Sequence, residues 1–232
     1  MKKYSFLFFL FTIVVDTGAT GQSLAPHKNI NDSLTYIALG DSYTTGRAVS
    51  TDQSFPYQLA ALLKHKNLKV AAPVLIAQNG WRTDELLKGI SNSDTSKTVD
   101  FVTLLIGVNN QFQHYGIAVY QTEFTLLLKR AVKFTGGNAR HVFVLSIPDW
   151  GVTPYANGRN RDKIAEEIDQ YNAINKDASE KAGANYINLT DLSRAMADDE
   201  SYIAGDKLHP SGKMYSLWAQ KLAAAINKQF KK

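Results

Sequence analysis

Short apolar runs alternate along the chain with longer stretches in which apolar side chains recur every three or four residues. Several of the short runs are continuously apolar, as expected of strands in a parallel sheet that is covered on both faces. The pattern predicts strands over five ranges: Leu34–Leu39, Val70–Ala77, Phe101–Ile106, His141–Ile147 and Asn185–Leu189.

The longer stretches are typical of amphipathic helices, because their apolar residues fall on one stripe of the helical period. They predict helices over Ser54–Lys66, Ile117–Phe134, Asp162–Ala182 and Ser211–Phe230. Strands that alternate with helices indicate an α/β fold, here a three-layer α/β/α sandwich with right-handed crossovers. Ligands of such sheets bind beyond the carboxyl ends of the strands. The residues that follow each strand are therefore the candidates for chemistry.

The first residues of the chain depart from this alternation. Lys2 and Lys3 precede the apolar run Tyr4–Val15, and small residues follow it. The run is short for a membrane span, and the order of charge, apolar run and small residues is that of an export signal. We therefore expect a signal peptide over residues 1–21, a single domain over residues 22–232, and a secreted or periplasmic protein. A buried first strand and an uncleaved anchor are the alternatives.

Composition narrows the class of protein. The 232 residues are 44% hydrophobic and 20% charged, which suits one globular domain. No cysteine is present, so disulfides, thiolate nucleophiles, cysteine-ligated metals and a lipoprotein anchor are excluded. The net charge of +5 is dispersed and forms no basic cluster, which argues against nucleic-acid binding. We expect no stable membrane anchor in the mature chain.

The first predicted strand is followed by Gly40-Asp41-Ser42-Tyr43-Thr44-Thr45-Gly46. A glycine at the strand end permits a tight turn, and Ser42 then stands where a helix begins, with its hydroxyl near helix N-terminal amides. The segment taken alone also fits an ordinary turn, because glycine, aspartate and serine are common turn and cap residues.

Two further segments follow the second and third strands. In Gln78-Asn79-Gly80-Trp81-Arg82-Thr83-Asp84, Gly80 allows a backbone N–H to approach a ligand oxygen closely, although a plain β-turn fits as well. In Gly107-Val108-Asn109-Asn110, the amide of Asn109 can donate to a developing oxyanion, although an Asx-turn is equally compatible.

The fourth segment is Asp206-Lys207-Leu208-His209-Pro210, near the C-terminus. A carboxylate and an imidazole three residues apart can lie on one face of a turn. Asp206 can then accept from one ring nitrogen of His209 and leave the other nitrogen free to act as a base. None of the other four histidines has an acidic residue in this spacing at a strand-to-helix junction.

These four segments, in the order serine, glycine, asparagine and aspartate-histidine, resemble the GDSL or SGNH hydrolase superfamily from Tyr36 to about Ile226. The resemblance implies a flavodoxin-like sandwich of about five parallel strands. It also implies that Ser42 is the nucleophile, His209 its general base and acid, and Asp206 the residue that orients the imidazole. One departure is Asn110, where many members carry aspartate, which puts a supporting contact in doubt.

In the implied oxyanion hole, the backbone N–H groups of Ser42 and Gly80 act with the side-chain amide of Asn109. The implied reaction is hydrolysis of carboxylic esters through an acyl-enzyme, with no metal and no organic cofactor. The substrate is expected to be a small-molecule ester or an acylated lipid or glycan.

Several aromatic residues that follow strand ends are candidates to line the pocket, foremost Trp81 and Trp150, with Phe112, Tyr115 and Tyr155 beside them. The segment Pro148–Gly151 is the best candidate for specificity. Two alternatives remain open: an acyltransferase of the same fold, and a non-catalytic exported ligand-binding module.

Overall fold

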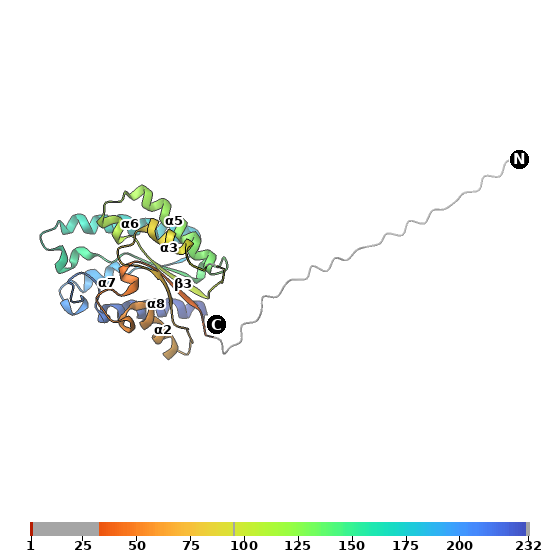
Figure 1. Cartoon of the computed structure of the whole chain (residues 1–232), viewed down its shortest axis with the longest axis horizontal. Helices are drawn as coiled ribbons and strands as arrows, with labels where there is room; N and C mark the ends of the chain where they lie inside the picture. The colour runs from red at the N-terminus through yellow and green to blue at the C-terminus, as the bar shows by residue number, and fades with distance from the viewer. Residues whose placement is uncertain (2–32, 95, 231–232) are drawn as a thin grey trace. The chain divides into compact units, whose positions relative to one another are not determined.

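The computed structural model describes Met1 and residues 33–94 and 96–230. Within these residues five parallel strands form one sheet in the order β2-β1-β3-β4-β5 (Figure 1). This is the flavodoxin-like order, and it confirms the predicted parallel α/β sheet. The strands are β1 (Tyr36–Gly40), β2 (Val74–Ala77), β3 (Phe101–Leu105), β4 (Val142–Leu145) and β5 (Asn185–Ile187).

Helices cover both faces of the sheet and make the fold a three-layer α/β/α sandwich (Figure 1). Helices α2 (Phe55–His65) and α8 (Gly212–Phe230) pack together on one face. Helices α3 (Thr83–Ser91), α5 (Ile117–Phe134) and α6 (Arg161–Ala182) lie on the other. Short helices α1 (Ser42–Thr45), α4 (Val108–Phe112) and α7 (Thr190–Ala195) follow β1, β3 and β5.

The three central strands explain why the sequence reads as continuous apolar runs. Every residue of β1, β3 and β4 is buried, because helices lie against both faces of these strands. The edge strand β2 is different, and the side chain of Val74 is 59% exposed. The hydrophobic core therefore lies along the middle of the sheet and anchors the ends of β1 and β3.

The second strand is shorter than predicted. It begins at Val74, whereas the apolar run begins at Val70, and Val70 makes only an isolated bridge with Leu34. Pro73 stands between them and has no N–H with which to continue the ladder. The prediction of a strand over Val70–Ala77 was therefore wrong in its first half.

Other elements also differ from the predictions, and the ends of β1, β3, β4 and β5 lie up to two residues from the predicted ones. Helix α3 was not predicted, because it is short and buries few apolar side chains, among them Leu86 and Ile90. His141, predicted as the start of the fourth strand, ends a 3₁₀ turn before β4. The four longer predicted helices are confirmed to within a residue or so at each end.

The predicted signal peptide, residues 1–21, lies outside the described residues except for Met1. Among the helices that the structure describes, none is both long enough and apolar enough to cross a membrane.

Candidate active site

The order of the strands in the sheet identifies the place where a ligand can bind. Strand β1 has β2 on one side and β3 on the other, so the connection from β1 to β2 and the connection from β2 to β3 run in opposite directions. A crevice opens at such a switch point, at the carboxyl ends of the strands. The segments that carry Ser42, Gly80 and Asn109 all begin there, because they follow β1, β2 and β3.

The turn that presents Ser42 depends on a glycine. A Cβ atom on Gly40 would lie 2.2 Å from the Thr44 hydroxyl oxygen and 2.3 Å from the Leu105 carbonyl oxygen, so no larger residue fits. Ser42 is then the first residue of α1, and Asp41 caps that helix by accepting from the Tyr43 N–H at 3.0 Å. The close packing of the turn against β3 fixes where the Ser42 side chain begins.

Asp41 is itself unusual, because its side chain is fully buried and Oδ2 has no hydrogen-bond partner among the described residues. Burial raises the pKa of this carboxyl to about 7, against the lowering effect of the hydrogen bond from the Tyr43 N–H. The residue that directly precedes Ser42 is therefore a carboxyl group whose charged form is destabilised by burial.

The predicted aspartate-histidine turn forms and reaches Ser42. His209 Nε2 lies 2.9 Å from Ser42 Oγ, and His209 Nδ1 lies 2.6 Å from Asp206 Oδ2. The other carboxylate oxygen of Asp206 accepts from the backbone N–H groups of Leu208 at 3.1 Å and His209 at 2.9 Å. The structure therefore brings together the three side chains that the sequence singled out.

The loop around His209 is held from two sides. The backbone N–H of Ala204 donates to the His209 carbonyl at 2.7 Å, and the N–H of Tyr155 donates to the Lys207 carbonyl at 3.0 Å. The His209 ring also lies 5.6 Å from the Tyr43 ring, centre to centre. These contacts fix the imidazole against α1, where Ser42 stands.

Burial and the neighbouring charges together determine the pKa of His209. Burial lowers the pKa of the imidazole, the Arg47 guanidinium lowers it further, and Asp206 only partly offsets them, so the pKa lies below its ordinary value. Burial alone would raise the pKa of Asp206, but the hydrogen bonds from His209 and Leu208 hold it below its ordinary value. At neutral pH Asp206 is therefore an acceptor only, so the ring proton sits on Nδ1 and the lone pair of Nε2 faces Ser42.

The loop after β2 is tied to α1. The hydroxyl of Thr45 donates to the Asn79 side-chain oxygen at 2.6 Å, next to Gly80. Gly80 has a φ of +84°, a conformation that strongly favours glycine. Apart from its two chain neighbours, no described residue has an atom within 4 Å of where the Cβ of Gly80 would be, so there is open space beside it.

Asn109 lies at the start of α4 and is half-buried. Its side-chain amide donates one hydrogen bond, at 3.0 Å, to the Trp81 carbonyl oxygen. An amide carries two N–H groups, so the second remains available. Asn109 and Gly80 line one cavity with Ser42 and His209.

The neighbouring Asn110 supplies a contact that the sequence left in doubt. It is fully buried, accepts from the Thr83 N–H at 3.1 Å and donates to the Thr83 hydroxyl at 2.7 Å. The Thr83 hydroxyl in turn donates to Glu123 of α5. Asn110 therefore joins the end of β3 to the start of α3, and only its buried polar character hints at this in the sequence.

The cavity beside Ser42 has a volume of about 120 Å³ and an aromatic wall. We use this name for Phe112, Trp150 and Tyr155, whose rings contact one another at centre-to-centre distances of 5.5–6.4 Å. Trp81, also predicted to bind substrate, is placed differently. Its ring lies against Gly89 of α3, and Trp81 is not among the residues that line this cavity.

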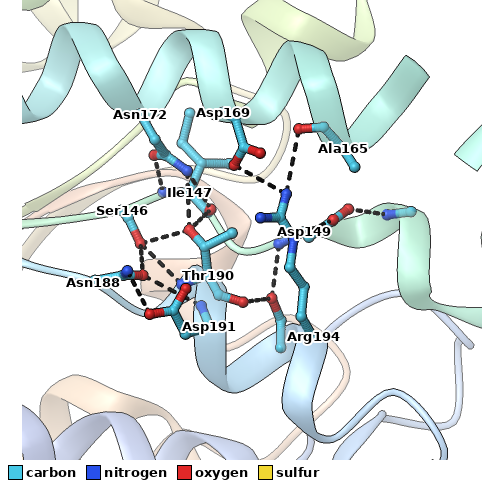
Figure 2. Close-up of polar contacts among 12 residues, drawn as sticks. Ser146, Ile147, Asp149, Ala165, Asp169, Asn172, Asn188, Thr190, Asp191 and Arg194 are labelled. Carbon is cyan, nitrogen blue, oxygen red and sulfur yellow. Dashed lines mark hydrogen bonds and ion pairs between the residues drawn. The ribbon is translucent and has the colours of Figure 1, made fainter. Parts of the chain in front are cut away.

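The segment that follows β4 is held by a polar network (Figure 2). The buried carboxylate of Asp149 accepts from the Gly151 N–H at 2.8 Å and from Arg194 Nε at 2.9 Å. The side chain of Asn172 pairs with both backbone groups of Ile147, at 2.7 and 3.0 Å. The segment Pro148–Gly151 is thus fastened to α6 and α7, and it presents the Trp150 ring to the cavity.

No three histidine, aspartate or glutamate side chains in the described part of the chain converge in a way that could hold a metal ion. The side chains around Ser42 suit nucleophilic chemistry: a hydroxyl, a basic ring nitrogen against it, the partly exposed carboxylate of Asp206 behind, and donors opposite.

Comparison with known proteins identifies the family of the chain. Residues 38–217 match the model of the GDSL-like lipase/acylhydrolase family. The chain is 20% identical to the uncharacterized protein YpmR of Bacillus subtilis (strain 168), over 93% of this chain and 90% of that protein.

Two solved structures share the fold. One is the lipase/acylhydrolase from Enterococcus faecalis, with a TM-score of 0.67 and 16% identity, covering 84% of this chain and 96% of that one. The other is a Geobacillus acetyl-xylooligosaccharide esterase variant, with a TM-score of 0.62 and 19% identity, covering 88% of this chain and 97% of that one. Because the family model spans well over half of its residues, the chain belongs to the GDSL-like lipase/acylhydrolase family and is a hydrolase.

Proposed function

We propose that this hydrolase cleaves carboxylic esters through an acyl-enzyme on Ser42. The observation that carries the proposal is the hydrogen-bonded series from Ser42 Oγ to His209 Nε2, at 2.9 Å, and from His209 Nδ1 to Asp206, at 2.6 Å. Both distances lie within hydrogen-bond reach, as a nucleophile and its oriented base require. The substrate is a small-molecule ester or an acylated lipid or glycan.

In the first step, Ser42 Oγ forms a bond to the ester carbonyl carbon as its proton passes to His209 Nε2. The carbonyl electron pair moves onto its oxygen, which becomes the oxyanion. Asp206 stabilises the imidazolium that results. The oxyanion then expels the alcohol, the bond between the carbonyl carbon and the alcohol oxygen breaks, and His209 gives its proton to that oxygen.

In the second step, water attacks the acyl group on Ser42 while His209 takes a proton from it. The second oxyanion collapses, Ser42 leaves with the proton that His209 returns, and a carboxylic acid is released. In both steps the oxyanion is proposed to accept from the N–H groups of Ser42 and Gly80 and from the free N–H of Asn109. Such donors act mainly on the transition state, where the charge on that oxygen is largest.

The test is hydrolysis of 4-nitrophenyl esters of increasing acyl length over a range of pH. We expect release of 4-nitrophenol from the acetyl or butanoyl ester. Because the base must be unprotonated, kcat/KM should be constant near neutral pH and fall only as the pH drops through the lowered pKa of His209. The acidic limb should thus lie below pH 6.5, the ordinary pKa of histidine. A limb well above 6.5, or no release from any ester, would contradict the proposal.

We also propose that the chain is exported and cleaved before Gln22, from the order of Lys2, Lys3 and the apolar run Tyr4–Val15. Mass spectrometry of the protein from its native host should find an N-terminus near Gln22 in the secreted or periplasmic fraction. Intact Met1 in the cytosolic fraction would disprove export.

A further inference from the structure

Among the side chains that line the cavity beside Ser42, Arg47 is the one that is permanently charged. It lies just past the C-terminal end of α1 and is exposed, and within the described residues its guanidinium has no ion pair and no side-chain hydrogen bond. Its charge reaches the catalytic centre, because it lowers the pKa of His209. Because no carboxylate in the described residues neutralises Arg47, its guanidinium is available to bind an anion at the cavity.

A second arginine stands over the aromatic wall. The guanidinium carbon of Arg159 lies 5.6 Å from the centre of the Phe112 ring, 5.5 Å from that of Trp150 and 5.3 Å from that of Tyr155. Contact with the ring faces holds the planar group in place without using its N–H donors. In the described chain it has no carboxylate partner either, so these donors remain available to a ligand.

The two arginines border neighbouring cavities. Arg159 lines a second cavity, of about 150 Å³, which shares Phe112 and Trp150 with the cavity beside Ser42. The one carboxylate among the residues that line these two cavities is Glu167. It is already engaged, since it accepts from the Gln111 side chain at 2.7 Å and lies 3.8 Å from Lys163. The lining on both sides of the aromatic wall therefore carries excess positive charge.

We propose that the substrate is an ester that bears a negatively charged group, a carboxylate or a phosphate, which Arg47 or Arg159 binds while the ester lies at Ser42. This rests on the function proposed above. A guanidinium presents paired N–H donors that match the two oxygens of either anion. The charge lies away from the bond that breaks, so the contact stabilises bound substrate and transition state alike and acts mainly on KM.

The experiment compares pairs of esters in which one member carries an added anionic group. On the acyl side, the mono-4-nitrophenyl ester of glutaric acid is paired with 4-nitrophenyl pentanoate. On the alcohol side, 1-butanoylglycerol 3-phosphate is paired with 1-butanoylglycerol. In the unaltered enzyme we expect kcat/KM to favour the anionic member of at least one pair by about tenfold, the order of a charged hydrogen bond. The pair that shows the preference identifies the anion and its side, and the preference should shrink at high salt.

Substitution assigns the effect to the arginines. In Arg47→Gln or Arg159→Gln, the ratio of the two kcat/KM values should fall towards one, through KM. Arg47→Gln should also move the acidic limb of the pH profile upwards, because a charge that lowers the pKa of His209 is gone. The matched control is Arg130→Gln, which removes an exposed arginine of α5 that lines neither cavity, and it should keep the ratio.

Binding separates this proposal from the function on which it rests. Calorimetry of the Ser42→Ala protein measures affinity for each ester without turnover. Tighter binding of an anionic member, lost on adding Arg47→Gln or Arg159→Gln, supports the anion site even if no ester is hydrolysed. Equal or weaker binding of both anionic members, or a preference that survives both substitutions, overturns it, whether or not neutral esters are cleaved.

Discussion

Ser42→Ala is expected to lower kcat for 4-nitrophenyl butanoate by on the order of 10⁶, the loss found when a serine nucleophile paired with histidine is removed. The substitution removes the one side-chain oxygen that His209 Nε2 contacts at 2.9 Å. Alanine fits the same space and suits the first turn of α1, so the variant should stay folded. Initial rates, together with a denaturation curve for each protein, measure both effects.

Ser91→Ala is the matched control for this change. Ser91 ends α3, and its hydroxyl donates to the Leu87 carbonyl within the same helix. Its loss should leave turnover as it was. If purified Ser42→Ala protein kept the unaltered rate, the nucleophile would have to be sought elsewhere in the cavity.

Asn109→Ala is expected to lower kcat by on the order of 10²–10³ with little change in KM, the effect of removing one oxyanion donor. The amide is held by its hydrogen bond to the Trp81 carbonyl, at 3.0 Å, so its free N–H has a fixed direction. The charge on the carbonyl oxygen grows only as the tetrahedral state forms, so bound substrate should lose little. Steady-state kinetics on one ester separates kcat from KM.

Asn110→Ala tests whether Asn109, and not its neighbour Asn110, is the oxyanion donor. The side chain of Asn110 is fully buried and paired with Thr83, so its removal leaves the Thr83 N–H without its partner. We expect a loss of about 1–3 kcal/mol in the free energy of unfolding and a much smaller fall in kcat than for Asn109→Ala. The assignment fails if Asn110→Ala, measured where it is fully folded, has the lower kcat, or if Asn109→Ala raises KM alone.

Much of the fold was predictable because its signals are local. Continuous apolar runs mark β1, β3 and β4, which helices cover on both faces, and the helical stripes mark α2, α5, α6 and α8. The position of the candidate residues followed from one further argument: the carboxyl ends of parallel strands lie at the same edge of the sheet, so residues that follow different strands come together there. The spacing of Asp206 and His209 is also a local signal, and the two side chains are hydrogen-bonded to each other in the structure.

What the sequence missed depends on contacts between distant residues. Trp81 and Trp150 both follow strand ends, but one packs on α3 and the other is carried to the cavity by the network around Asp149. That network joins residues more than forty positions apart, such as Asp149 and Arg194. The catalytic roles of Ser42 and Asn109 remain predictions that the substitutions above test.

The short edge strands of the sheet limit the length over which a strand of another molecule could pair with it. A parallel sheet of buried strands is rich in the segments that join side by side into aggregates when their backbone groups are free. Here β2 has four residues and begins after Pro73, which has no N–H to offer, and β5 has three. A strand from a second copy would find few donors and acceptors along either edge. The interruption of the second apolar run therefore shortens the edge that β2 offers for strand pairing, in a chain whose central strands are almost wholly apolar.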